Sequence, residues 1–202
     1  MRIVAIDASP RRGAVSSSVD AAAAAARSAG AEVEVVRLHD LKIRSCTGCG
    51  MCKVSGVCKI DDDLPALAER IDAADGVILG VPPYFRKPDQ TTAAFLERVS
   101  GYFSSSGQMR LPGMGPRDIG QAPVARDTKR AVIITACTAP DPLATFFGYT
   151  TGPMRSLRAA LGSTGIRTVG SLAVTQVRGS QETSPSERDQ ARSLGRILAG
   201  KI

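Results

Sequence analysis

Four cysteines lie within thirteen residues of this chain, at Cys46, Cys49, Cys52 and Cys58. Their spacing is C-x2-C-x2-C-x5-C, with glycines between them. Short glycine-bearing links let successive thiolates turn inward onto one metal centre, and four such thiolates are the ligands of a [4Fe–4S] cluster. The spacing therefore favours an iron–sulfur cluster on these four residues, with vacant thiols as the main alternative.

Other uses of the four cysteines fit the spacing less well. A structural zinc site usually takes two ligand pairs separated by a dozen or more residues, which this run lacks. Disulfides inside so tight a loop are difficult to form geometrically, and an intracellular compartment would keep the thiols reduced. An ordinary ferredoxin would place the fourth cysteine after three residues, follow it with proline, and be much smaller.

A second candidate site follows the first apolar run of the chain. Residues 8–18 are rich in serine, carry Arg11 and Arg12, and lead into a predicted helix. Backbone N–H groups at a helix N-terminus, the helix dipole, serine hydroxyls and an arginine together make an anion site. Neither the Rossmann pattern G-x-G-x-x-G nor the Walker pattern G-K-[ST] occurs in this loop. Serines that merely cap the helix are an equal alternative.

The elements that position these residues alternate along the chain. Short apolar, β-branched runs predict strands at 2–6, 32–38, 76–80, 129–136 and 167–176. Helical patterns predict helices at 17–29, 90–99 and 153–161, and a last helix to about 198 that opens with a capping box at Ser184 and Glu187. A further helix follows Asp61, Asp62 and Asp63, which we expect to cap it.

Five strands with intervening helices predict an α/β domain, a doubly wound parallel sheet with helices on both faces. Such sheets bind ligands at the carboxyl ends of their strands, which selects the loops after the first, third and fourth strands. The cysteine loop, at 44–59, leaves the second strand at the same edge, so we expect the metal centre and the ligand crevice on one side of the molecule. The Gly- and Pro-rich residues 101–128 predict a long irregular loop within a single domain over 1–202.

Composition narrows the class of protein. The chain has 202 residues, 43% of them hydrophobic, which supports one ordinary domain with a real core. No apolar stretch approaches the ~18 residues of a membrane span, and the first residues lack a signal-peptide pattern, so we expect a cytoplasmic protein without a membrane partner. The net charge is +7, but the basic residues are scattered and aromatic residues make up 4%. We therefore expect no nucleic-acid binding, and acidic or anionic partners instead.

Several motifs together resemble the NADPH-dependent FMN reductase family, whose fold is flavodoxin-like with strand order 2-1-3-4-5. The run Ser9-Pro-Arg-Arg-Gly is similar to the FMN phosphate loop of that family, and the segments 81–85 and 94–98 are similar to its third flavin loop and the following helix. The cysteine spacing resembles that of the iron–sulfur flavoproteins within the family, with the aspartates 61–63 following. The resemblance covers nearly the whole chain.

The resemblance implies a set of cofactor-binding positions in this sequence. Residues implied at the FMN phosphate are Ser9, Arg11 and Ser16, with Ser17 and Ser18 as neighbours that can substitute. Residues implied beside the flavin ring are Pro82, Pro83, Tyr84, Phe85 and Arg86, with Thr135, Ala136 and Cys137 in the loop after the fourth strand. Cluster ligands implied are Cys46, Cys49, Cys52 and Cys58, and no acid–base side chain is assigned a catalytic role. Val15 stands where the family commonly has Asn, and Arg86 where it often has Gly.

The resemblance implies one FMN and one [4Fe–4S] cluster per chain, in an oxidoreductase or electron-transfer protein that assembles as a homodimer or homotetramer. NAD(P)H or an acidic, ferredoxin-like carrier would be its redox partner. The leading alternative is a cluster-free NAD(P)H-dependent FMN or quinone reductase with structural or redox-sensing cysteines. A flavin- or metal-sensing binding protein on the same fold is a third possibility.

Overall fold

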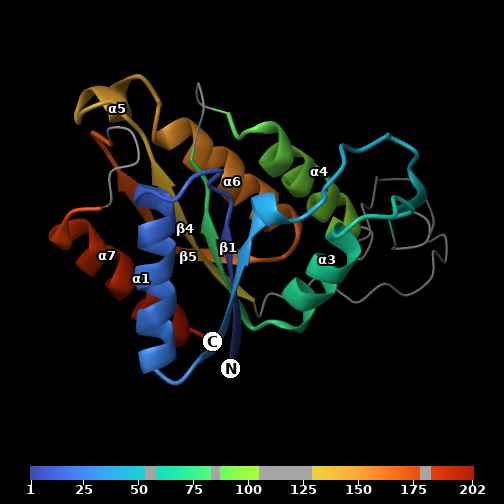
Figure 1. Ribbon diagram of the computed structural model, residues 1–202, viewed down its shortest axis with the longest axis horizontal. Helices are drawn as coiled ribbons and strands as arrows, with labels where there is room; N and C mark the ends of the chain where they lie inside the picture. Colours follow the sequence, from blue (N-terminus) through green and yellow to red (C-terminus); the bar gives the residue numbers. More distant parts are fainter. Residues whose placement is uncertain (53–57, 83–86, 105–128, 178–182) are drawn as a thin grey trace, which may run out of the picture.

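A five-stranded parallel sheet forms the centre of the computed structural model, which describes residues 1–52, 58–82, 87–104, 129–177 and 183–202. Its strands are β1 (Arg2–Asp7), β2 (Glu32–Arg37), β3 (Gly76–Gly80), β4 (Arg130–Ala136) and β5 (Arg167–Val174). They are hydrogen-bonded in the order β2-β1-β3-β4-β5 (Figure 1), which confirms the predicted sheet.

Helices cover both faces of the sheet. The longer helices are α1 (Ala14–Ser28), α3 (Leu64–Ala73), α4 (Gln90–Ser104), α6 (Thr151–Ser163) and α7 (Pro185–Ala199), and the short ones are η1 (Leu38–Asp40) and α5 (Leu143–Phe146). Alternate strand residues point to opposite faces. Accordingly Val4 and Ile6 of β1 belong to the core beneath α3, α4 and α6, and Ile3 and Ala5 to the core beneath α1 and α7.

Some helix boundaries differ from the sequence predictions. Helix α1 begins at Ala14 rather than at 17, because Ala14 and Val15 are buried against the sheet and belong to the core. Helix α4 runs on to Ser104, so the first part of the loop predicted at 101–128 is helical, and 105–128 lies outside the described residues. The short η1 and α5 carry too few residues to show a periodic pattern.

The carboxyl ends of β1, β3 and β4 meet at one edge of the sheet. The amide of Ala8 donates to the Gly80 carbonyl at 2.9 Å, and the amide of Val81 donates to the Ile134 carbonyl at 2.9 Å. A side chain at Gly80 is excluded, because its Cβ would lie 2.3 Å from Cγ2 of Val19 in α1. The start of α1 is thus held directly over the edge where the loops after β1, β3 and β4 leave the sheet.

Helices α1 and α7 lie side by side on their face of the sheet (Figure 1). They approach so closely at Gly195 that a Cβ there would lie 2.1 Å from the Ala22 carbonyl oxygen. The predicted capping box at the start of α7 is present: the Ser184 hydroxyl accepts from the Glu187 amide, and the Glu187 carboxylate accepts from the Ser184 amide. Across the described ranges, no helix combines the length and apolarity that a membrane crossing requires.

Candidate functional site

The loop after β1 folds around one backbone carbonyl. The hydroxyls of Ser9 and Ser16 both donate to the Arg11 carbonyl, at 2.6 and 3.3 Å. The Ser9 amide donates to Oδ1 of Asp7 at 3.0 Å, which fixes the turn to the end of β1. Ser9 and Ser16 are buried and Arg11 is exposed, so the structure brings together the three residues implied at the phosphate.

The N-terminus of α1 has no side-chain cap in the part of the chain that the structure describes. Gly13 occupies the cap position, and the Ser9 and Ser16 hydroxyls point to a carbonyl rather than accepting from the first helical amides. The first turn carries no acidic residue. Uncapped amides at a helix N-terminus are an anion site, whereas serines acting as caps would have occupied them. This arrangement fits a phosphate group better than the capping alternative.

The neighbouring residues of this loop have other surroundings. The Ser17 hydroxyl lies 2.8 Å from the Thr183 hydroxyl and accepts from the Thr183 amide at 3.3 Å. Ser18 is fully buried, and one turn later Ala22 touches α7. Val15 is buried against the end of β3, where its Cγ1 leaves no room for a side chain at Gly80.

Thr183 is a residue of this site that sequence reasoning missed. It is buried, and it reaches Ser17 across 166 positions of sequence. Its carbonyl accepts from Nε of Arg188 at 3.0 Å, which ties the start of α7 to the loop before it. No local pattern marks such a residue, because its contact with α1 is made by the packing of two distant helices.

The loop after β4 closes the same edge of the sheet. Thr135 is buried, and its hydroxyl has no hydrogen-bond partner among the described residues. Ala136 is buried beside it, and the Cys137 amide donates to the Val174 carbonyl at 2.8 Å. Burial raises the pKa of the Cys137 thiol. Pro82 is half-buried after β3, and the predicted Pro83, Tyr84, Phe85 and Arg86 lie outside the described residues.

The cysteine segment, residues 44–59, offers thiols and tight glycine turns. All four of its cysteines are free thiols, with Cys46 and Cys49 exposed and Cys52 and Cys58 partly buried. Gly48 and Gly50 adopt the left-handed region, with φ of +68° and +70°, which favours glycine at these positions. A backbone hydrogen bond from Met51 and a side-chain hydrogen bond from Thr47 lower the pKa of the Cys49 thiol.

The donor set of this segment fits an iron–sulfur centre in its chemistry. Four thiols joined by short links with glycines in left-handed turns are what such a centre requires. Within the described ranges, however, no three His, Cys, Asp or Glu side chains are gathered closely enough to hold a metal ion. The four sulfurs are therefore close in sequence without being assembled into one site.

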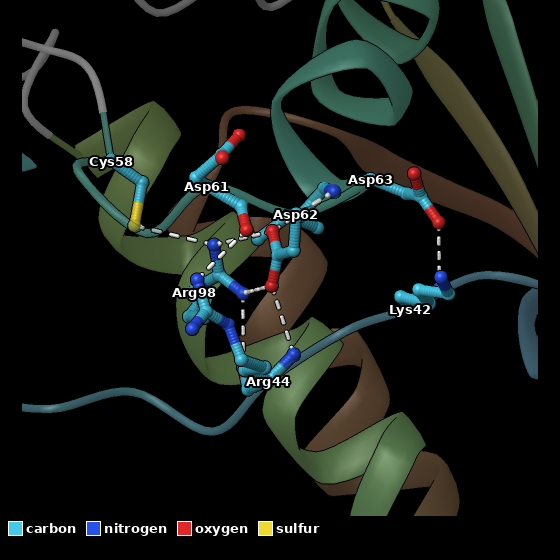
Figure 2. A network of polar contacts seen from close by, with 8 residues as sticks. Lys42, Arg44, Cys58, Asp61, Asp62, Asp63 and Arg98 are labelled. Carbon is cyan, nitrogen blue, oxygen red and sulfur yellow. Dashed lines mark hydrogen bonds and ion pairs between the residues drawn. The ribbon is translucent and has the colours of Figure 1, made fainter.

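A buried ion pair anchors the segment to α4 (Figure 2). Nη1 of Arg98 lies 2.5 Å from Oδ2 of Asp62, and Nη2 lies 3.0 Å from Oδ1. The two side chains are 1% and 2% exposed. Asp62 also accepts from the amides of Arg44 and Leu64, at 2.9 and 3.2 Å. Burial alone would raise the pKa of the Asp62 carboxyl, but the hydrogen bonds from Arg98 and from these two amides hold it below its ordinary value.

The two ends of the cysteine segment are joined to each other. The Lys42 amide donates to Oδ2 of Asp63 at 2.7 Å, the Asp63 amide donates to the Lys42 carbonyl at 3.1 Å, and Nη2 of Arg44 donates to the Asp61 carbonyl at 2.7 Å. The prediction that the three aspartates cap the next helix is thus largely wrong. Asp62 accepts from the first amide of α3, whereas the Asp63 carboxylate accepts from the Lys42 amide and Asp61 takes part in closing the loop through its backbone carbonyl.

The cysteine segment lies along the second half of α4. Nη2 of Arg98 is 3.3 Å from Sγ of Cys58, and a Cβ at Gly101 would lie 3.3 Å from Sγ of Cys52. Arg98 is about 12 Å along the helix from Gln90, at 1.5 Å per residue. Figure 1 shows this segment beyond α4 on the right, and the start of α1 on the left. The cysteine segment therefore packs on α4, and the expectation that the metal centre and the ligand crevice lie on one side of the molecule stays a prediction.

Comparison with known proteins places these features in a family. The family model described as NADPH-dependent FMN reductase matches residues 1–110. A protein from Archaeoglobus fulgidus named iron–sulfur flavoprotein is 37% identical over 103 residues, which cover 50% of this chain and 47% of that protein. The chain matches about half the length of its curated relatives.

Solved structures extend the likeness over the whole chain. An NAD(P)H:quinone oxidoreductase from Methanothermobacter marburgensis has a TM-score of 0.71 at 18% identity, covering 98% of each chain. Flavodoxin 1 from Bacillus cereus has a TM-score of 0.61 at 15% identity, covering 100% of this chain and 99% of that one. At these identities the likeness shows the fold, which is flavodoxin-like as predicted. Since the family model includes both the loop before α1 and the entire cysteine segment, the chain belongs to the NADPH-dependent FMN reductase family.

Proposed function

We propose that this protein is an FMN-dependent oxidoreductase that couples a bound FMN to a [4Fe–4S] cluster. The observation that carries the flavin part is the uncapped N-terminus of α1 behind the Ser9–Arg11–Ser16 turn, at the carboxyl edge of a flavodoxin-like sheet. The cysteine spacing supports the cluster, as does the name iron–sulfur flavoprotein that the curated relatives carry.

The residues of the crevice would bind and orient the flavin. The first amides of α1, with Ser9, Arg11 and Ser16, would hold the phosphate. The buried hydroxyl of Thr135 would gain the partner it lacks among the described residues. Residues 82–86 and 136–137 are proposed to border the ring, with Arg86 and Lys87 adding positive charge near it. FMN, when bound, exchanges electrons both in pairs and singly, and the protein supplies position and exclusion of water.

The cluster is tested by replacing one proposed ligand. Cys52→Ala should abolish iron and acid-labile sulfide while leaving FMN bound, because the phosphate loop lies on another part of the chain. The matched control is Cys137→Ala, which removes a thiol outside the segment and should keep four iron and four sulfide per chain, the content of one such cluster. Anaerobic purification with iron, sulfide and FMN quantified per chain gives the answer. A Cys52→Ala protein with full iron content would show that the ligand assignment is wrong.

A cluster-free NAD(P)H-dependent FMN or quinone reductase is the second candidate. It is favoured by one observation, that the described cysteines are not gathered into a metal site. FMN without iron or sulfide in the anaerobic preparation, after reconstitution, would select it. NAD(P)H or an acidic electron carrier is the proposed redox partner, since the net charge of +7 attracts anionic molecules.

We propose that the protein works as a homodimer or homotetramer. The cysteine segment packs along α4 at one side of the sheet, where self-association would bring a neighbouring subunit's flavin site to it (Figure 1). Phe146 is 82% exposed beside Phe147, which is apolar surface that self-association would cover. Sedimentation equilibrium checks this proposal, and a single species of 21.1 kDa would contradict it.

A further inference from the structure

We propose that Arg98 is a positioning residue for Cys58: its guanidinium holds the fourth cysteine in place as a metal ligand and donates a charged hydrogen bond to its sulfur. This inference rests on the cluster in the proposed function. It goes further, because it singles out one of the four cysteines as the fixed point of the segment and names the residue outside the segment that fixes it.

Hydrogen bonds fix the orientation of the Arg98 guanidinium beside Cys58. Nη1 donates to Oδ2 of Asp62 and, at 2.9 Å, to the Arg44 carbonyl. Nη2 donates to Oδ1 of Asp62 and, at 3.3 Å, to Sγ of Cys58. The four hydrogens on these two nitrogens are thus matched by four acceptors, which come from both ends of the cysteine segment (Figure 2).

The surroundings make these contacts strong. The Arg98 side chain is almost wholly buried, and a bidentate carboxylate prevents the planar fork from rotating. Asp62 is held in turn by two backbone amides. Successive hydrogen bonds therefore connect the backbone to Asp62, Asp62 to Arg98, and Arg98 to Cys58. Among the described cysteines, Cys58 is the one whose sulfur accepts from a charged side chain.

A fixed donor of this kind changes what Cys58 does as a ligand. The thiolate is the form that binds metal, and the hydrogen bond from Nη2 of Arg98 orients the Cys58 sulfur. Hydrogen bonds to ligand sulfurs and net charge are also among the factors that set the reduction potential of a cluster. Cys52 packs against the same helix at Gly101, whereas Cys46 and Cys49 are exposed. Metal binding would therefore begin from the side of α4 and draw the two exposed cysteines in.

A double-mutant cycle tests whether Arg98 acts through Cys58. Metal-free protein is titrated anaerobically with cobalt(II), and binding is followed by the thiolate-to-cobalt absorption bands. Arg98→Lys keeps a charge for Asp62, but a single ammonium cannot span both the carboxylate and the sulfur. We expect it to weaken cobalt binding by about 10- to 100-fold. In a Cys58→Ser background the same change should cause little further loss, because its target sulfur is gone.

The matched control is Arg70→Lys, which alters another arginine–carboxylate pair: Nη1 of Arg70, near the end of α3, lies 2.7 Å from Oε1 of Glu34 in β2. It should leave cobalt affinity unchanged. Each variant is first shown to unfold cooperatively in urea, and Arg98→Gln replaces Arg98→Lys if the lysine variant does not fold. Reconstituted iron–sulfur protein gives a second readout, since losing the donor should shift the cluster potential to a more negative value while FMN content stays constant.

The outcomes separate this inference from the function on which it rests. If Arg98→Lys weakens cobalt binding equally with and without Cys58, or not at all, then Arg98 is only structural and the inference is overturned while the cluster stands. If the unsubstituted protein binds neither cobalt nor reconstituted iron, the cluster is wrong and the inference falls with it. A cycle in which the Arg98 effect disappears with Cys58 supports both.

Discussion

At the scale of single residues, the Arg98–Asp62 pair joins three parts of the chain that the sequence keeps apart. Arg98 comes from α4, Asp62 from the segment before α3, and the Arg44 backbone from the start of the cysteine segment. A buried ion pair is more stable when its remaining hydrogen-bonding groups are also satisfied. Asp62 accepts from two backbone amides, whereas Nε of Arg98 has no hydrogen-bond partner among the described residues. The pair therefore fixes where the cysteine segment attaches to the domain.

Asp62→Asn should destabilise the protein in a pH-dependent way. At pH 7 we expect a loss of about 3 kcal/mol in the free energy of unfolding, because Arg98 remains buried with a weakened partner. The Asp62 pKa is lowered in the folded protein. The stability that the charged Asp62 carboxylate contributes is therefore complete above its pKa in the unfolded chain, about 3.9. This stability is lost as the pH falls through the pKa of Asp62 in the folded protein. The difference between the two proteins should shrink below about pH 4.

Urea unfolding at neutral and acidic pH measures this difference. The matched control is Asp189→Asn, which breaks an exposed pair with Arg192 at 2.9 Å and should change stability by no more than about 0.5 kcal/mol. A gap between wild type and Asp62→Asn that stays constant into acid would mean that the charge of Asp62 is not what stabilises the anchor.

At the scale of elements, the contact between α1 and α7 holds the loop that we propose binds the phosphate. Helix α1 starts at this loop, and Thr183, just before α7, binds Ser17 in its first turns. The two helices can approach because Gly195 presents no side chain to the backbone at Ala22. The α7 helix therefore positions the start of α1 although it contributes no residue predicted at the phosphate.

Gly195→Ala should push these two helices apart. Alanine is the better helix former by about 1 kcal/mol, yet its Cβ would lie 2.1 Å from a backbone oxygen, which no side-chain rotation can relieve. We expect a net loss of about 1–3 kcal/mol in stability and weaker FMN binding. Thermal unfolding and FMN titration measure both effects. Gly162→Ala in α6, where a Cβ meets nothing within 4 Å, is the matched control and should be neutral or stabilising. Equal effects of the two changes would refute the packing argument.

At the scale of the whole molecule, the proposed FMN site is built from loops that only the assembled sheet brings together. A ligand that binds there and not to the unfolded chain must stabilise the complete domain. FMN at a hundred times its Kd should add about 2.7 kcal/mol to the free energy of unfolding. Riboflavin at the same concentration as FMN should add much less to the free energy of unfolding. It lacks the phosphate that would bind at the start of α1, so its Kd should be higher.

Substitution at the phosphate loop sharpens this prediction. Ser16→Ala should weaken FMN binding about tenfold, as expected for one hydrogen bond to a charged group, and leave riboflavin binding unchanged. Ser193→Ala removes an exposed hydroxyl on α7 that donates to the Asp189 carbonyl, and serves as the control. Equal stabilisation by FMN and riboflavin, measured by thermal unfolding, would show that the loop before α1 does not bind the phosphate.

Much of this protein could be predicted from its sequence, because the relevant signals are local. Apolar runs of five to eight residues fixed the strands within one or two positions, as at β3 (Gly76–Gly80) and β4 (Arg130–Ala136). The capping box at Ser184 and Glu187 was readable because its two partners are three residues apart. The turn of Ser9, Arg11 and Ser16 and the four clustered cysteines are likewise close in sequence, so their chemistry could be named before their geometry was known.

Only the tertiary structure decided how these local features relate to one another. The sequence does not show that Thr183 meets Ser17, or that Asp63 binds the Lys42 amide instead of capping α3. It does not show that Arg98 reaches Cys58, which places the cysteine segment along α4. The physical reason is that periodicity and spacing report interactions within a helical turn or along a strand, whereas these contacts join residues 21 to 166 positions apart through the packing of whole elements.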